Sequence, residues 1–423
     1  MLSKDFEDRG RYKGIRNPVA TTWLISFKQI SRDSPVVARH LKFICFLAEK
    51  QIPISLLPPA SDQLEADEAI GILKAYAFIT NHEGHDSFDM HRLVRLATRT
   101  WLDKGGKHKV CVTEVIRHLN QAIPYPRSYN KHIWIKYLPH LEAALGSRDG
   151  YADKSASFLL QIARQCYCVL GQFHKAEQKA WQVLELQEKL FSKKHLETLM
   201  TMERIAIDLS QQGKYEEAEA VFRQTVKLKR KVLGEDNPHT LTCMGNLGTV
   251  LHDLGKYMEA EKMHRQALDQ SVKVLDKDNP DIAFRMSNLA VVLSSRGKHE
   301  EAEGLCRQAM EQMRTRLGEE HPDRLSSMGT LGAVLSSQGN YEEAEGLFRR
   351  TVKLREKVLG KEHPHTLMSL SNLAAVLKLQ GKRENAVALM EKYYQLRVQK
   401  LGPDHHMTRS SRRALNVWKL EGQ

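Results

Sequence analysis

The sequence predicts an all-α protein, a right-handed superhelix of tandem helix-turn-helix repeats preceded by a small domain of helices and two short strands. Three observations support this prediction. A short signature that begins with glycine recurs every 42 residues, and a second signature in a loop keeps the same period. Between the two signatures, apolar residues recur at helical spacing.

The repeat holds its register along the back of the chain. The first signature reads GKYEEA at Gly213, GKYMEA at Gly255, GKHEEA at Gly297, GNYEEA at Gly339 and GKRENA at Gly381, with a weaker GQFHKA at Gly171. The second reads LGEDNPHT from Leu233 and returns as LDKDNPDI, LGEEHPDR, LGKEHPHT and LGPDHHMT. A register without insertions predicts units that stack and bury one continuous core.

Each period is predicted to hold two helices. The first extends over about residues 240–254, with leucines and a methionine on one face, and Gly255 ends it as a turn glycine. The second begins at Tyr257 and ends before Pro280, because the residue that precedes a proline avoids the helical conformation. Neither helix can bury its apolar face alone, so the pairs must stack.

Small and large residues alternate within each pair of helices. One position of the first helices holds Gly248, Ala290, Gly332 and Ala374, and one position of the second helices holds Ala218, Ala260, Ala302, Ala344 and Ala386. This alternation resembles the tetratricopeptide repeat, and the 42-residue period with its LG-(K/E)-(E/D)-(H/N)-P loop resembles the kinesin light chain subtype. The resemblance covers about residues 152–420. His264 and Cys306 depart from it, because that position usually holds a large hydrophobic residue.

We therefore expect a kinesin light chain-type array over residues 151–423, closed by a capping helix at about 408–420. Arg409, Arg412 and Arg413 are expected to point outward from that helix, as a cap requires. The resemblance also implies that the first helix of each pair lines a concave groove.

Candidate peptide-binding residues lie at two register positions of those first helices. One position holds Arg204, Asn246, Asn288, Thr330 and Asn372, and the position one turn or more further on holds His252, Ser294, Ser336 and Lys378. The resemblance implies that the asparagines contact the backbone of an extended peptide, which an amide can do because it both donates and accepts hydrogen bonds. The alternative is that they form structural hydrogen bonds between helices. The polar, mildly basic second row favours acidic or polar peptides.

The front of the chain has a different pattern. A helix is expected to begin near Pro35, and a second one to cover about residues 62–75. The segments YAFIT and DSFDM, separated by NHEGH, predict two short strands, and His91 opens a third helix. Helix, helix, hairpin and helix is a winged-helix arrangement, which we place at residues 17–104. A charged segment precedes it at 1–16, and a helical connector is expected at 105–150.

Residues 17–102 resemble the winged-helix end of an NB-ARC domain of the type found in fungal NLR-like signal ATPases. Met90 and His91 match the Met-His-Asp motif of that family, in which the histidine senses the β-phosphate of bound ADP, but Arg92 replaces the aspartate. His91 is therefore either a vestigial nucleotide sensor or a packing residue. No G-x-x-x-x-G-K-[ST] phosphate loop is present in the chain, and DKGGKHKV lacks the hydroxyl residue.

The sequence shows no recognisable catalytic machinery, so we expect no enzyme activity and no cofactor. No serine, cysteine or acidic pair stands in a known nucleophile motif. His82, His85 and His91 lie close in sequence, but they lack the spacing of zinc ligands, and no metal is expected. No small-molecule substrate is expected either.

Composition narrows the class of partner and the compartment. The net charge of +13 is divided into +6 over residues 1–150 and +7 over the rest, and it is mixed with acids, which argues against a nucleic-acid surface. No apolar run is long enough to span a membrane. The charged start without a hydrophobic segment and the scattered single cysteines favour a cytoplasmic location.

The leading prediction is a non-catalytic interaction scaffold that binds peptides or proteins in the groove, within a truncated NLR-like signalling protein. One alternative is a kinesin light chain-like cargo adaptor, although residues 1–150 lack the heptads that such an adaptor uses to join a motor. Another is nucleic-acid binding by the winged helix through Arg92, Arg95 and Arg99, which recur at helical spacing.

Overall fold

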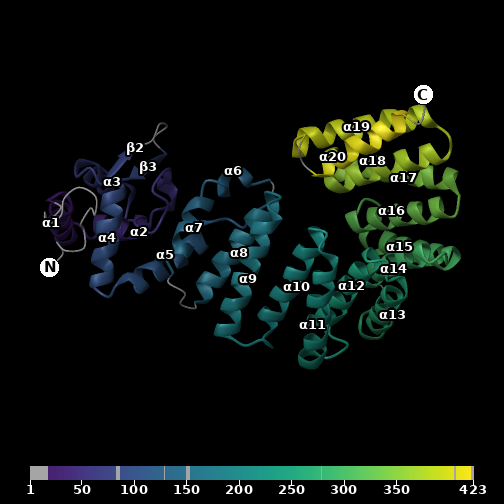
Figure 1. Cartoon of the computed structure of the whole chain (residues 1–423), viewed down its shortest axis with the longest axis horizontal. Helices are drawn as coiled ribbons and strands as arrows, with labels where there is room; N and C mark the ends of the chain where they lie inside the picture. The colour runs from purple at the N-terminus through teal and green to yellow at the C-terminus, as the bar shows by residue number, and fades with distance from the viewer. Residues whose placement is uncertain are drawn as a thin grey trace. The chain divides into compact units, whose positions relative to one another are not determined.

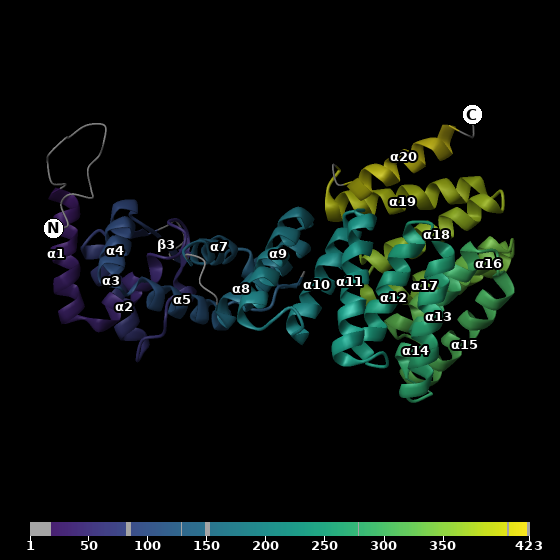
Figure 2. The same cartoon turned by 60° about the horizontal axis from the view of Figure 1, so that its bottom comes forward.

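The computed structural model describes residues 18–81, 86–127, 129–148, 153–277, 279–403 and 406–420. They are almost entirely helical, and the chain divides into two compact units after Gly213 (Figures 1 and 2). The all-α prediction is confirmed.

The first unit begins with the elements that were predicted to form a winged helix. They are α1 (Pro18–Asp33), α2 (Pro35–Ile44), β1 (Ile52–Pro53), the 3-10 helix η1 (Ile54–Leu56), α3 (Gln63–Ala75), β2 (Ile79–Asn81), β3 (Ser87–Met90) and α4 (Arg92–Lys104). The remaining helices of the unit are α5 (His108–Ala122), α6 (Lys131–Trp134), α7 (Leu138–Gly146), α8 (Lys154–Val169), α9 (Phe173–Leu190) and α10 (Leu196–Gln211). The expected order of helix, helix, hairpin and helix is present as α2, α3, β2–β3 and α4.

The small sheet has one more strand than predicted. β3 lies between antiparallel β1 and β2, with Ile52 opposite Phe88 and Ile79 opposite Met90. β1 holds only two residues, one of them Pro53, which is too short to show an alternating pattern. Tertiary pairing with β3, and not local sequence, makes it a strand.

One apolar core extends through the first unit from α1 to α9. It includes Leu41 of α2, Trp134 of α6, Leu159 of α8 and Val183 of α9, all buried. The predicted winged helix, the connector and the first, degenerate repeat share this core because α5 packs against both α2 and α8. The division into 17–104, 105–150 and 151–423 remains a proposal, and the segment 1–16 lies outside the described residues.

The second unit consists of regular helix pairs. They are α11 (Tyr215–Leu233), α12 (Pro238–Asp253), α13 (Tyr257–Val274), α14 (Pro280–Ser295), α15 (His299–Leu317), α16 (Pro322–Ser337), α17 (Tyr341–Leu359), α18 (Pro364–Leu379), α19 (Arg383–Leu401) and α20 (His406–Leu420). The helix predicted at 240–254 is α12, and the helix predicted to begin at Tyr257 is α13. Arg409, Arg412 and Arg413 are exposed on α20, as expected of a cap.

The same turn chemistry bounds each pair. Gly255 has a φ of 74°, a left-handed conformation that glycine adopts without steric cost, and its counterparts in the other repeats also have positive φ. Before each first helix, the side chain of Asn237, Asn279, His321 or His363 accepts a hydrogen bond from the backbone N–H two residues later, and a proline follows at the first helical position.

Within each pair, a small residue on the first helix faces a larger one on the second. A methyl group added at Gly332 would lie 2.9 Å from the Phe348 ring, and one added at Gly248 would lie 2.7 Å from the His264 ring. Where the register position of Phe348 holds the smaller Cys306, the first helix holds Ala290 in place of glycine. In these three repeats the volumes of the two positions are therefore complementary.

Ion pairs link successive second helices of this unit. Arg223 contacts Glu219 on its own helix at 2.8 Å and Glu259 of the next repeat at 2.5 Å. Arg265 does the same with Glu261 and Glu301, at 2.9 and 2.7 Å. Arg307 follows with Glu303 and Glu343, at 2.8 and 2.7 Å. We call this series the arginine ladder.

Candidate partner-binding face

The exposed side of the first helices in the second unit forms the candidate site. Because α12, α14, α16 and α18 each pack against the next member of the series, they form one continuous layer. Each presents exposed or half-buried side chains at four register positions, spaced i, i+4, i+7 and i+11. We call this surface the first-helix face.

The asparagine row lies on this face, at the i+4 position. Asn246, Asn288, Thr330 and Asn372 are all half-buried. Asn246 has interactions of its own within the protein. Thr330 donates to the carbonyl of Ser326 on its own helix at 3.2 Å.

Asn288 and Asn372 differ from these two, because neither has a hydrogen-bond partner among the described residues. Their amides can donate to and accept from an added chain without first breaking an internal bond. A structural hydrogen bond between helices, the alternative interpretation of the row, is therefore not what holds these two side chains.

Arg204 belongs to the first unit. It lies on α10 and donates from Nη1 to Oε1 of Gln161 on α8, with 3.1 Å between the two atoms. Its guanidinium therefore connects two helices of its own unit.

The second predicted row serves contacts between repeats. His252 forms a 2.9 Å hydrogen bond through Nε2 with the hydroxyl of Ser295, at the end of the next first helix. Lys378 places its ammonium 5.1 Å from the centre of the Trp418 ring on the capping helix. Ser294 and Ser336 are half-buried. His252 and Lys378 thus couple neighbouring first helices or the cap, which leaves them less available to a partner than the sequence pattern predicts.

Four large apolar side chains on the same face were missed by sequence reasoning. Phe284 is 53% exposed, Val291 38%, Met368 49% and Leu379 56%. Their signal is in the sequence, since Phe284 and Val291 flank Asn288 at one turn of α14 on either side. These residues belong neither to the buried stripe of the first helices nor to the row of amides. The first-helix face therefore carries both polar and large apolar side chains.

His91 lies at the start of α4, where its Nδ1 accepts a hydrogen bond from the backbone N–H of Leu93 at 3.2 Å. It is exposed and acts as a helix cap. Of the predicted basic stripe on α4, Arg95 donates to the carbonyl of Cys45 and to Glu49, and Arg99 contacts Ser147 and the Phe46 ring. Two of the three arginines are thus engaged within the protein, which weakens the nucleic-acid alternative.

Metal and membrane features can be assessed only in the described part of the chain. No group of three or more histidine, cysteine or acidic side chains there could hold a metal ion, and His82 and His85 lie outside the described residues. None of the helices in the described ranges is both long and apolar enough to cross a membrane.

The stacked helix pairs define a helical-repeat protein. The chain belongs to the tetratricopeptide repeat family, whose profile matches residues 156–231, 205–271, 240–304, 281–357 and 331–398, together more than half of the chain. The repeat family predicted from the sequence is confirmed.

One curated relative agrees with the NLR-like resemblance drawn from the sequence. A nucleotide-binding leucine-rich repeat (NLR)-like protein of Hyaloscypha variabilis is 40% identical over 204 residues, which are 48% of this chain and 20% of that protein. The matched region is thus about a fifth of that relative's length.

Two solved structures are similar to parts of the chain. A kinesin light chain of Podosopora anserina with nearly identical TPR-like repeats is 26% identical, with a TM-score of 0.40, and the match covers 49% of this chain and 98% of that one. A signal transduction ATPase with a tetratricopeptide repeat sensor from Pyrococcus horikoshii is 11% identical, with a TM-score of 0.44, and the match covers 94% and 62%.

Proposed function

We propose that the chain is a non-catalytic scaffold that binds an extended segment of a protein partner on the first-helix face. The observation that carries the proposal is the pair Asn288 and Asn372. Each amide occupies the same register position, half-buried on an exposed face, without a hydrogen-bond partner among the described residues. Amides in such a row can pair with the backbone of a chain that has no strand beside it.

The apolar side chains on the same face add to the expected recognition. Phe284 and Val291 flank Asn288, and Met368 and Leu379 flank Asn372. A partner segment that offers polar backbone to the asparagines and some apolar side chains to their flanks would bury both kinds of surface. We expect the other side chains of the partner segment to be acidic or polar, because this chain carries a net charge of +13.

The signalling role is proposed from the NLR-like relative. The two proteins are 40% identical over 204 residues. In this proposal the repeats capture the ligand, within an NLR-like signalling protein of the cytoplasm. His91 then has the role of a helix cap and is at most a remnant of nucleotide sensing.

Comparative affinity capture from a lysate of the source cells tests the proposal. The full chain is compared with a triple variant, Asn246→Ala, Asn288→Ala and Asn372→Ala. A matched control removes three exposed amides from second helices, Gln224→Ala, Gln308→Ala and Asn385→Ala. All three proteins must first show the same melting temperature.

We expect a set of proteins that the wild type and the control retain and the first triple variant loses. Motor subunits in that set would favour the cargo-adaptor alternative, and NLR-like proteins would favour the signalling role. Equal capture by all three proteins would contradict the proposal, because binding would then not use the first-helix face.

A further inference from the structure

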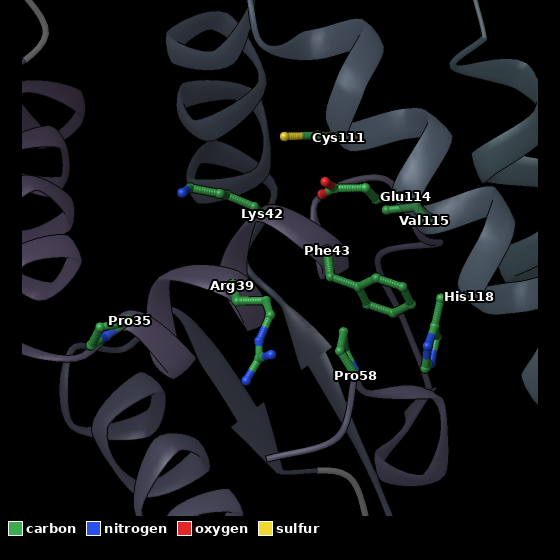
Figure 3. A pocket seen from close by; sticks show the side chains of 9 residues that line it. All are labelled: Pro35, Arg39, Lys42, Phe43, Pro58, Cys111, Glu114, Val115 and His118. Carbon is green, nitrogen blue, oxygen red and sulfur yellow. The ribbon is translucent and has the colours of Figure 1, made fainter. Parts of the chain in front are cut away.

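A cavity of about 370 Å³ lies in the first unit, outside the tetratricopeptide array. It opens between α2, α5 and the loop that follows η1 (Figure 3). Its lining consists of Pro35, Arg39, Lys42, Phe43, Pro58, Cys111, Glu114, Val115 and His118. Its volume is within the range of ordinary small-molecule sites.

Two helix faces meet at this cavity. Arg39, Lys42 and Phe43 share one face of α2, because they are three and four residues apart. On α5, Cys111, Glu114, Val115 and His118 follow the spacing i, i+3, i+4 and i+7 and also share one face. The two helices pack against each other, yet charged side chains line the gap that they leave.

The charges of the lining are unbalanced. Arg39, Lys42 and Glu114 form no hydrogen bond or ion pair among the described residues. The charge of Arg39 does act on Glu65 of α3, whose pKa is lowered mainly by hydrogen bonds from Ser61 and further by Arg39. Figure 3 shows Arg39, Lys42 and Glu114 around the cavity, with Arg39 and Lys42 on separate sides of it. Two cations against one carboxylate leave the lining residues with a net charge of +1.

The other two titratable groups of the lining add no charge near neutral pH. The Nε2 of His118 lies 3.0 Å from the carbonyl oxygen of Leu56, so Nε2 donates the proton, and burial lowers the pKa of this histidine. The neutral ring then leaves Nδ1 as a hydrogen-bond acceptor. Burial also raises the pKa of the Cys111 thiol, and the charge of Glu114 raises it further, so this sulfur stays protonated and weakly polar.

One wall of the cavity is apolar. Phe43 and Val115 are buried, and the Phe43 ring meets the His118 ring edge to face, with 5.0 Å between the ring centres. Figure 3 shows Pro58 beside these two rings. Transfer of a hydrocarbon group from water to this wall would be favourable.

We propose that this cavity binds a small amphipathic monoanion, with its carboxylate at Arg39, its hydrocarbon part against Phe43, Pro58 and Val115, and the charge of Lys42 acting on it at longer range. A single negative charge neutralises the lining, whereas a dianion would exceed it. Because α2 belongs to the predicted winged helix and α5 to the predicted connector, a bound ligand would also fasten one to the other. This site is independent of the partner-binding face.

The test measures binding of 3-phenylpropanoate to the full chain by ligand-observed NMR. The neutral isostere 3-phenylpropanamide and the dianion phenyl phosphate serve as comparison probes. We expect saturable binding of 3-phenylpropanoate at millimolar concentration, and at least about tenfold weaker binding of the amide, since a charged hydrogen bond contributes that much. Phenyl phosphate is expected to bind more weakly than the carboxylate.

Variants assign the binding to this cavity. Arg39→Gln should weaken binding of 3-phenylpropanoate about tenfold. Lys42→Gln should weaken it by less, because its charge acts at longer range, and Glu114→Gln should tighten it by removing the opposing charge. Arg117→Gln is the matched control, because Arg117 is an exposed cation on α5 that does not line the cavity. No saturable binding, equal binding of the amide, or unchanged binding by folded Arg39→Gln and Lys42→Gln proteins would overturn the proposal.

Discussion

The two units of this chain obtain stability from different kinds of contact. In the second unit each repeat reuses the same registered contacts, such as the volume match of Gly332 with Phe348 and the arginine ladder. In the first unit the core joins elements far apart in sequence, and single contacts occur once. Arg164 and Asp208, for example, form a buried ion pair between α8 and α10, whereas the register position of Asp208 holds Val250 in the next repeat.

The comparison shows that repetition spreads the stability of the unit over many similar contacts. A repeated contact can be weak, because each copy adds to a sum of similar terms between neighbours. A contact that occurs once has no copies to compensate for its loss. Its removal is therefore costly, particularly when it leaves a buried charge without a partner. Substitutions at such contacts of the first unit should therefore lower the free energy of unfolding more than substitutions at the arginine ladder.

The largest effect is expected for Asp208→Ala. Asp208 is 1% exposed and accepts from Nε of Arg164 at 2.7 Å. Its removal leaves a guanidinium largely buried without its carboxylate, which costs about 3–5 kcal/mol. Urea unfolding followed by circular dichroism measures the change. A loss below about 1 kcal/mol would mean that water or another group satisfies Arg164.

Acid should destabilise the second unit through His264. The ring is buried, its Nε2 has no hydrogen-bond partner, and burial lowers its pKa to about 4. The unfolded chain binds a proton near pH 6.5 and the folded chain does not, so stability is full above pH 6.5 and falls as the pH drops toward 4. The loss through this residue is up to about 3 kcal/mol.

The variant His264→Phe isolates that effect. It reproduces the pairing of Phe348 with Gly332, because His264 also faces a glycine, Gly248. We expect higher stability at pH 5 and a flatter dependence of the urea midpoint on pH between 4 and 6.5. Cys306→Phe is the matched comparison and should destabilise, since its partner position holds Ala290. An unchanged pH profile in His264→Phe would contradict the assignment.

A smaller effect is expected from two glycines of one helix, α16. Gly332→Ala places a methyl group 2.9 Å from the Phe348 ring and should cost about 1–2 kcal/mol. Gly329 has no heavy atom within 4 Å of the added methyl position, so Gly329→Ala should instead gain up to about 1 kcal/mol from helix propensity. Thermal melts of the two variants measure the change in stability of each. A change in the same direction for both variants would refute the volume match.

The smallest effect is expected at the ladder. Glu343→Gln removes a partner that lies 2.7 Å from Arg307 but is 48% exposed, and it should change the free energy of unfolding by less than about 0.5 kcal/mol. The remaining effect should vanish in 1 M salt. Denaturation at low and high ionic strength measures it. A loss comparable to that of Asp208→Ala would show that the ladder acts as one cooperative network.

The sequence predicts the second unit almost completely and the first only in outline. A fixed period of 42 residues locates Gly255 at a turn and Tyr257 at a helix start, because each repeat meets the same neighbours. The role of His252 was missed because its partner, Ser295, lies in the next repeat. In the first unit, β1 and the cavity between α2 and α5 depend on contacts between distant segments, and local patterns do not encode those contacts.

The candidate site was predictable in part. The register position of Asn288 and Asn372 followed from the repeat together with the resemblance to the kinesin light chain subtype. The sequence does not show which row stays available to a partner, because Lys378 and His252 are taken up by contacts that only packing determines.

Site-specific photo-crosslinking tests most directly whether partners bind the first-helix face. A benzophenone amino acid replaces Val291, an exposed residue of that face on α14, or Lys262, an exposed residue of the second helix α13. The full chain is then irradiated in a lysate of the source cells. The account predicts crosslinked partners from position 291 that disappear when Asn288→Ala and Asn372→Ala are added, and none of them from position 262. The same partners from position 262 and none from 291 would contradict it.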